Sequence, residues 1–213
     1  MPGFFGRKHR KPARYYLYLS QTKIDMLVPQ LPRSVAKGLD VELTARTGVI
    51  DAKVGRRATG SADSLVSYVP AIEKYLIGQR KVGSLDHPTE YVRGVDLMRY
   101  GVVGEHAADI AVFVSVRMDI KFALVGSSTS MVGTAPRHEA NHAPFYYMAE
   151  FLNQLDGADV VPRHLDHDSF ADAIDIALAA LPSSPHRVEF LAKVLYTEPH
   201  IILASPVYVS LFS

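Results

Sequence analysis

Hydrophobic and polar residues alternate along the chain with spacings that distinguish strands from helices. The aromatic run Tyr15–Leu19 is short and ends in polar residues, which is typical of a strand. Thr22–Leu27 then has apolar residues at helical spacing, and Pro29 ends that helix early. Ala62–Ile77 carries apolar residues at steps of three and four, which predicts a longer amphipathic helix.

The ends of this longer helix also have sequence signals. Ser61 is suited to cap its first turn, and Gly78 is suited to end it. Pro70 lies inside the helical pattern, so we expect a kink or two shorter pieces.

Most of the strand-forming residues lie in the middle of the chain. Glu90–Val103, Asp109–Val116 and Ile120–Val125 are rich in β-branched and aromatic residues, and the short connection between the last two predicts a hairpin. An earlier hairpin is predicted from Asp40–Arg46 and Val49–Val54, which flank a glycine.

Helical spacing returns in the last third of the chain. Three helices are expected there, at Phe145–Leu155, Phe170–Leu181 and His186–Tyr196. The chain then ends in strand residues at Ile201–Leu203 and Val207–Leu211. Pro206 between them is expected to confine this strand to a sheet edge or to split it.

Strands that come in adjacent groups, and helices that come in groups, predict an α+β fold rather than a βαβ repeat. We expect a largely antiparallel sheet with the helices grouped on one side. The predicted organisation is a basic flexible tail over residues 1–14, followed by one compact domain over residues 15–213.

Composition narrows the classes of function. The chain has 213 residues, of which 48% are hydrophobic, so a sizeable core is expected. The lack of cysteine excludes disulfides and thiolate metal sites and fits a cytoplasmic protein. A net charge of +1 gives no reason to expect nucleic acid, and no apolar run has the ~20 residues of a membrane span.

The sequence HEANH at residues 138–142 matches H-E-x-x-H, the pattern of zinc proteases. That site requires a continuous helix, but Pro136 and Pro144 lie on either side of the motif and limit any helix to barely two turns. Candidates for a third ligand are His164, Asp166 and His167. A zinc hydrolase stays open as an alternative, whereas a polar loop with no metal and no cofactor is the preferred interpretation.

A serine-rich segment, Val125–Gly133, leaves the end of a strong strand. Small polar residues expose backbone N–H groups and hydroxyls, which suit an anion. The candidate anion ligands are Ser127, Ser128, Ser130, Arg137 and His142, and His138 is a candidate proton carrier. The alternative is a serine-rich turn with no ligand.

Ser20, Lys23 and Asp25 lie where the first strand ends and a helix begins, a place that often faces a ligand. We assign Ser20 and Lys23 to substrate binding and Asp25 to proton transfer. A solvated helix face explains the two charged residues equally well.

Residues 16–30 fit the pattern Y-L-Y-x-S-x-x-K-x-D-M-L-x-P-Q, and this segment resembles the opening of an actinobacterial family of small uncharacterised proteins. Glu90–Gly101, Val188–Leu195 and Ser205–Leu211 are similar to later family segments in the same order. The resemblance implies an actinobacterial cytoplasmic protein and strengthens the assignment of Ser20, Lys23 and Asp25. The family's loop at the serine segment is richer in glycine.

Two functions compete. The first is a cofactor-independent enzyme of specialised metabolism that acts on a small anionic metabolite, by elimination or by intramolecular displacement of sulfate or phosphate. Aziridine formation by one subunit of a complex is an example, although no motif carries that specific activity over. The second is a non-catalytic regulatory or interaction module. For either, we expect a homo- or hetero-oligomer that binds neither nucleic acid nor membrane.

Overall fold

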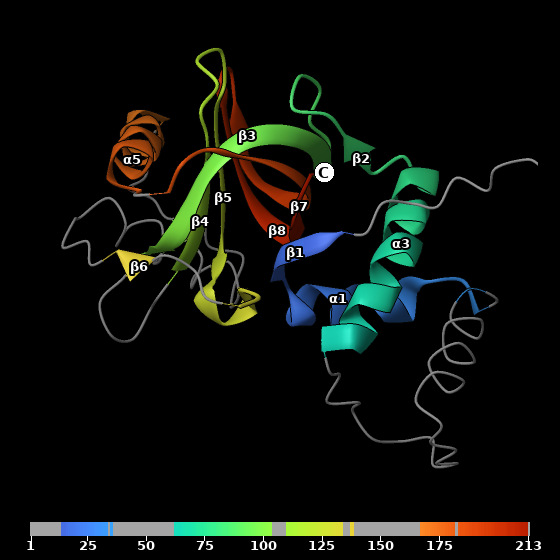
Figure 1. Ribbon diagram of the computed structural model, residues 1–213. Helices are drawn as coiled ribbons and strands as arrows, with labels where there is room; N and C mark the ends of the chain where they lie inside the picture. Colours follow the sequence, from blue (N-terminus) through green and yellow to red (C-terminus); the bar gives the residue numbers. More distant parts are fainter. Residues whose placement is uncertain are drawn as a thin grey trace, which may run out of the picture.

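A computed structural model of the protein describes residues 14–33, 35, 62–103, 110–133, 137–138, 167–181 and 183–212 (Figure 1). The helical elements are α1 (Gln21–Leu27), η1 (Val28–Gln30), α3 (Ala62–Gly78), η2 (Ser128–Ser130) and α5 (His167–Ala180). The strands are β1 (Tyr15–Leu19), β2 (Val82–Gly83), β3 (Tyr91–Val103), β4 (Ile110–Ser115), β5 (Lys121–Ser127), β6 (Arg137–His138), β7 (His186–Glu198) and β8 (Ile201–Leu211).

Five of the strands close into a barrel in the order β3-β4-β5-β8-β7 and back to β3. β7 closes it by pairing with both β3 and β8, and Met98 on β3 faces Ser115 of β4 on one side and His186 of β7 on the other. All these pairs are antiparallel except β5–β8, which is parallel. With α5 between the third and fourth barrel strands, this is the Greek-key strand order of OB-fold barrels.

Three short strands extend the barrel. β1 pairs antiparallel with the second half of β8, on the edge where β5 pairs with the first half. β2 and β6 each add two residues in parallel to β3. β1 therefore lies beyond β5 along the same edge of β8, and the chain passes from β1 directly into α1.

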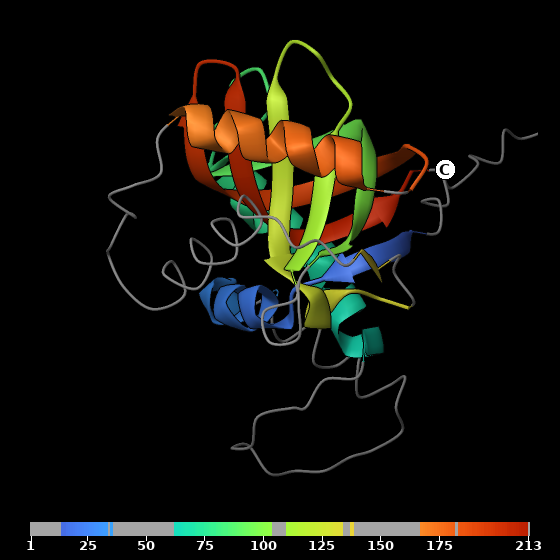
Figure 2. The same cartoon turned by 90° about the vertical axis from the view of Figure 1, so that its left-hand side faces the viewer.

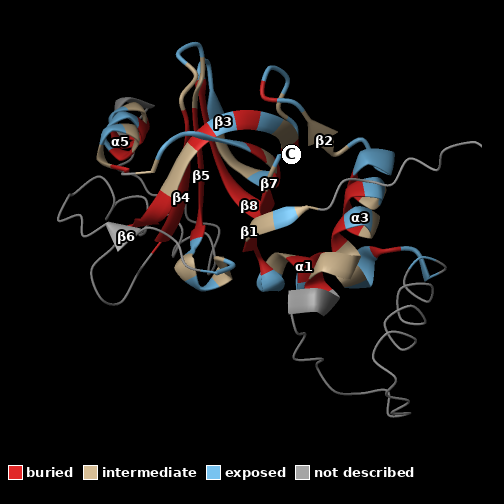
Figure 3. Cartoon of the chain, in the orientation of Figure 1, coloured by how far each residue is buried: buried red, intermediate tan, exposed pale blue. Residues whose placement is uncertain are grey.

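The barrel strands β4, β5 and β8 are buried on both faces, which explains their nearly continuous hydrophobic sequences. On β5, Phe122 and Leu124 point into the barrel interior, while Ala123 and Val125 lie under α5. α5 crosses the outer face of β4, β5 and β8 (Figure 2). α1 and α3 cover a different outer face, made by β1, β7 and β8, and Figure 3 shows the buried strand residues between these two helical layers.

The α+β prediction of one unit with sheet and helices is confirmed, but the prediction that the helices are grouped on one side is wrong. α5 and the α1–α3 pair lie on opposite sides of the barrel (Figure 1). The physical reason is closure: a barrel fills its own interior, so its outer surface offers several apolar faces that helices can cover.

The position of α5 also determines which strands are accessible. In OB-fold barrels the second and third strands carry the ligand-binding face. Here the corresponding strands are β4 and β5, and α5 covers their outer face.

The helix predicted at His186–Tyr196 is also wrong, because this segment is strand β7. Val188, Leu191 and Leu195 have helical spacing, yet Val188 packs inside the barrel and Leu191 packs outside under α3. A strand with two buried faces is apolar in both registers, so spacing alone did not separate it from a helix.

Two sequence predictions concerned prolines inside regular elements. β8 is one continuous strand. Pro206 lies where the β7–β8 register shifts: Leu191 pairs with Tyr208, and the next residue, Ala192, pairs with Pro206. Such a bulge accommodates the missing N–H of proline within a sheet. α3 is one helix that includes Pro70, so of the two predicted alternatives the two separate pieces are excluded and the kink stays a prediction.

The end of α3 differs from the sequence prediction. Arg80, not Gly78, takes the left-handed conformation, with φ 55°. The backbone N–H of Lys81 donates to Leu76 and that of Arg80 to Ile77, which is the Schellman pattern of a helix C-terminus.

Several sequence predictions lie outside the residues that the structure describes. These are the hairpin at 40–54, the helix at 145–155 and residues 1–13 of the tail. Within the described part of the chain, no helix has both the length and the apolar character needed to cross a membrane.

Candidate functional site

One end of the barrel brings together two segments that the sequence singled out separately. Tyr18 of β1 forms an isolated antiparallel bridge with Met131, directly after η2. The backbone N–H of Val132 also donates to the carbonyl of Leu17 at 2.9 Å. The η2 turn therefore lies beside the β1–α1 junction, as Figures 1 and 2 both show. We call this the serine end, comprising Ser20–Ile24 and Ser127–Met131.

Ser20 has a structural role at the serine end. Its side chain caps α1 by accepting a hydrogen bond from the backbone N–H of Lys23 at 3.4 Å. Its own backbone N–H donates to the carbonyl of Val207 at 2.9 Å, and the residue is 3% exposed. These contacts fix the first turn of α1 against β8.

Lys23 is half-buried and Asp25 is exposed. Because each residue of an α-helix turns by about 100°, side chains two positions apart leave the helix on different sides. Ile24 and Leu27 mark the buried face of α1, and Lys23 and Asp25 lie on either side of it. The structure therefore gives no common orientation to these two candidate residues.

Three of the candidate anion ligands belong to η2 or to its cap. Ser127 is the N-cap: its Oγ accepts from the backbone N–H of Thr129 at 3.3 Å and lies 2.7 Å from Thr129 Oγ1. Ser128 and Ser130 are half-buried within the turn. Ser127 thus shapes the turn, while Ser128 and Ser130 stay candidates for ligand contact.

Arg137 and His138 form β6, for which only the backbone is described. The strand pairings place Ser127, Ile110, Val103 and His138 in one row across four strands. Three strand spacings separate the first and last of these, so their backbones lie no more than about 15 Å apart. A contact of β6 side chains with an anion at η2 stays a prediction.

The zinc motif is described only at His138, because Glu139 and His142 lie outside the described residues. In the described part of the chain, no group of three or more histidine or carboxylate side chains is placed to hold a metal ion.

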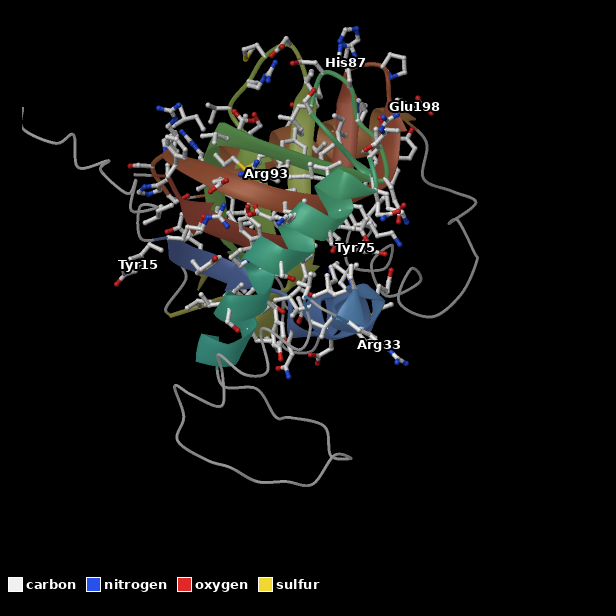
Figure 4. The ribbon with its side chains drawn as sticks, turned by 90° about the vertical axis from the view of Figure 1, so that its right-hand side faces the viewer. Tyr15, Arg33, Tyr75, His87, Arg93 and Glu198 are labelled. Atoms are coloured by element: carbon white, nitrogen blue, oxygen red, sulfur yellow. The ribbon has the colours of Figure 1, made fainter. Side chains whose placement is uncertain are left out.

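A cluster of ionised and aromatic side chains that sequence reasoning missed lies between α3 and the barrel. We call it the arginine–glutamate cluster, and its members are Arg14, Glu73, Arg93, Glu189 and Tyr208. Each arginine donates hydrogen bonds to both glutamates. The Arg14 guanidinium donates to Glu73 at 3.2 and 3.3 Å and to Glu189 at 3.1 Å. The Arg93 guanidinium donates to Glu73 at 3.1 Å and to Glu189 at 2.6 Å. Figure 4 labels Arg93 on the face of the barrel that α3 covers.

Tyr208 ties this cluster to the barrel wall. Its hydroxyl donates to Glu73 Oε1, and the Arg14 guanidinium lies 5.2 Å from its ring centre. Burial raises the pKa of Tyr208, and the hydrogen bond to Glu73 raises it further. Two guanidiniums and two carboxylates balance, so the cluster joins the N-terminal strand, α3 and the barrel without net charge.

Arg14 was assigned to the flexible tail from its sequence neighbours, but it is paired and its side chain is 25% exposed. The signal that the sequence did contain is Glu73. It lies on the buried side of α3, next to Ile72 and one turn from Val69 and Leu76. A carboxylate on the apolar side of an amphipathic helix implies a cationic or hydroxyl partner.

Comparison of the chain with curated proteins and with solved structures gave no match. A model of an uncharacterised protein family does match, over residues 14–213. The match begins at Arg14, the first described residue, and covers the barrel and all its helices. The match does not test the actinobacterial origin, which stays a prediction. Because the family model covers residues 14–213, the chain belongs to the family of unknown function DUF7019.

Proposed function

We propose that this protein binds a small anionic metabolite at the serine end and transforms it without a cofactor. The observation that carries the proposal is the Tyr18–Met131 bridge, which holds η2 beside the start of α1. Two polar segments about 110 residues apart in sequence thereby form one surface.

The chemistry of this surface favours an anion. Ser128 and Ser130 are small, so they leave nearby backbone N–H groups accessible to a ligand. Lys23 on the neighbouring α1 adds an ammonium group, and charge-assisted hydrogen bonds to an oxyanion are stronger than neutral ones.

The reaction that suits such a site is an elimination or an intramolecular displacement that releases sulfate or phosphate. In these reactions the leaving oxygen gains negative charge in the transition state. Fixed donors at the oxyanion would then lower the barrier more than they stabilise the substrate. His138 and Asp25 remain the proposed proton carriers, and an oligomer remains the proposed assembly.

A non-catalytic binding module is the second candidate, and two observations favour it. Ser20 and Ser127 use their hydroxyls to cap local structure, which is a scaffolding role. Lys23 and Asp25 also point away from each other, so α1 alone does not present a catalytic pair.

The binding claim is tested by NMR titration of the uniformly labelled protein with sulfate and with phosphate. Backbone amides of Ser128–Met131 and of Ser20–Ile24 should shift together and give one dissociation constant. Ser128→Ala combined with Ser130→Ala should weaken binding, whereas Ser184→Ala, an exposed serine on the α5–β7 connection, should not. Shifts confined to other parts of the chain would refute the site.

The catalytic claim is tested separately by incubating the protein with a panel of sulfate and phosphate esters and measuring release of inorganic anion. Release that Lys23→Ala reduces supports an enzyme. Anion binding at the serine end without any release identifies the binding module instead.

A further inference from the structure

The barrel has a further outer face, between α5 and the α1–α3 layer, on which apolar side chains are exposed. Val95 and Leu97 of β3 are 39% and 44% exposed, and Phe212, directly after β8, is 42% exposed. Figure 1 shows β3 passing between α5 on one side and α3 on the other, with the C-terminus beside it. Contiguous apolar surface with polar residues around it is typical of interaction sites.

These side chains form a strip that runs from β3 across β7 to the end of β8. Leu97 pairs with Arg187 of β7, and the backbone N–H of Phe212 donates to the carbonyl of Arg187 at 2.9 Å. The Arg187 guanidinium lies 4.5 Å from the centre of the Phe212 ring. Met98 and Val188 pack inside the barrel, so their neighbours along each strand point outward. We call this surface the β3–β7 face, and its members are Val95, Leu97, Arg99, Arg187 and Phe212.

Two guanidiniums lie on either side of Leu97, Arg187 opposite it on β7 and Arg99 two positions further along β3. In the described part of the chain neither contacts a carboxylate, unlike the arginines of the arginine–glutamate cluster. Arg187 stacks on Phe212, and Nη1 of Arg99 donates to the carbonyl of Leu178 at 3.2 Å. Nε of Arg99 is buried and has no acceptor among the same residues. The β3–β7 face therefore places unpaired positive charge beside its apolar strip.

The other outer faces of this barrel show what kind of element covers such a strip. α5 lies on β4, β5 and β8 through Ile174 and Ala177, and α3 lies on β7 and β8 through Val69 and Leu76. In both cases the apolar side of an amphipathic helix packs on the sheet, and its polar side faces solvent. A helix on the β3–β7 face would place its apolar stripe on the strip and its flanking residues beside the two arginines.

We propose that the β3–β7 face binds an acidic amphipathic helix of a partner protein. Its apolar stripe covers Val95, Leu97 and Phe212, and carboxylates beside the stripe pair with Arg99 and Arg187. Charge complementarity selects this occupant, because a basic helix would bring like charges together at both arginines. The proposal is independent of the function proposed for the serine end, which shares no residue with this face.

The test uses two synthetic helical peptides of about 18 residues, or five turns. Both carry leucines at steps of three and four, with glutamates on both sides of the stripe in one peptide and lysines at the same positions in the other. Fluorescence anisotropy measures each Kd with the full-length protein, and backbone amide shifts locate the bound peptide. The acidic peptide should shift Val95–Arg99 and His186–Val188. It should bind about tenfold or more tightly than the basic one, because two charge pairs change from attraction to repulsion.

Variants then assign the binding to this face. Val95→Thr combined with Leu97→Thr keeps strand propensity but removes apolar surface, so it should weaken the acidic peptide by about tenfold or more. Arg187→Gln should weaken it by about two- to fivefold and should not weaken the basic peptide. Two controls should leave binding unchanged. Met118→Thr changes an apolar residue that is 96% exposed on the β4–β5 connection, and Arg33→Gln changes an exposed arginine after η1.

Several results would overturn the proposal. The first group comprises no amide shifts on the β3–β7 face, equal binding of the two peptides, and equal weakening by the control variants.

The other possible occupants are tested on the protein without peptide. If sedimentation shows a dimer that the double threonine variant converts to a monomer, a second copy covers the face. If the double variant lowers the melting temperature by more than about 5 °C while Met118→Thr does not, the chain covers its own face. We expect the wild-type oligomeric state and a change in melting temperature below about 2 °C. The amide spectrum of each variant reports whether the fold is retained.

Discussion

Glu73→Gln perturbs the arginine–glutamate cluster with little change of shape, and its cost follows from burial. Glu73 accepts hydrogen bonds from Arg14, Arg93 and Tyr208, so its loss leaves two guanidiniums facing Glu189 alone. Breaking a fully buried pair costs about 3–5 kcal/mol, whereas an exposed pair contributes about 1 kcal/mol or less. The Glu73 side chain is 11% exposed, while those of Arg14 and Arg93 are 25% and 38% exposed.

These exposures place the cluster between the two limits. We therefore expect Glu73→Gln to lower the free energy of unfolding by about 2–3 kcal/mol. At about 2–4 °C per kcal/mol for a chain of this size, the melting temperature should fall by roughly 5–10 °C.

Urea unfolding, followed by circular dichroism and by tyrosine fluorescence, measures the free energy of unfolding, and coincident transitions justify a two-state fit. Glu90→Gln is the matched control. Glu90 pairs with Lys81 at 2.9 Å, but the two side chains are 44% and 42% exposed, so this change should cost less than about 1 kcal/mol. Equal losses in the two variants would refute the claim that burial makes the cluster stabilising.

Three further predictions test other parts of the structure. Arg80→Gly should raise the free energy of unfolding by about 1 kcal/mol in the same urea assay, because glycine adopts the left-handed conformation of the α3 C-terminus without strain; a loss of stability would contradict this cap. The pKa of Tyr208 is raised from 10.0, so the unfolded chain ionises this tyrosine first and stability should fall as pH rises above 10. Tyr208→Phe should make the alkaline fall shallower, and an unchanged slope would count against the buried phenol. The pKa of Asp119 is lowered from 3.8 to about 2, so its contribution to stability is present above pH 3.8 and is lost as pH falls toward 2. In Arg117→Ala, this part of the acid dependence should become smaller in melting curves recorded between these pH values, because the hydrogen bond from Arg117 is the largest cause of the lowered pKa.

The elements that could be predicted from sequence are those with one buried face or a clear boundary. α3 and α5 carry apolar residues at helical spacing, and the β4–β5 hairpin has a short polar connection, so local pattern was sufficient. β7 was not predictable in the same way. Its two faces pack against the barrel interior and against α3, and neither contact is visible from the segment itself.

Barrel closure could not be predicted for a related reason. It depends on the parallel pairing of β5 with β8, whose paired residues lie about 80 positions apart, Lys121 with Ile201. No local pattern encodes which distant edges meet. The same limit applies to the arginine–glutamate cluster, in which Glu73 and Tyr208 are 135 residues apart.

The candidate site was predictable only as separate segments. The serine turn and the β1–α1 junction were each identified from small polar residues at strand ends, but the bridge from Tyr18 to Met131 shows that they are neighbours. The cap roles of Ser20 and Ser127 depend on backbone geometry, which residue type suggests but does not determine.

Crystallography with selenate, an isostere of sulfate that has an anomalous signal, tests the central claim most directly. Crystals grown without sulfate or phosphate would be soaked at increasing selenate concentrations. We predict an anomalous peak at the serine end at the lowest effective concentration, about 2.7–3.2 Å from donors of η2 and close to the first turn of α1. Peaks that appear first elsewhere, with none beside Ser128 and Ser130, would contradict the account.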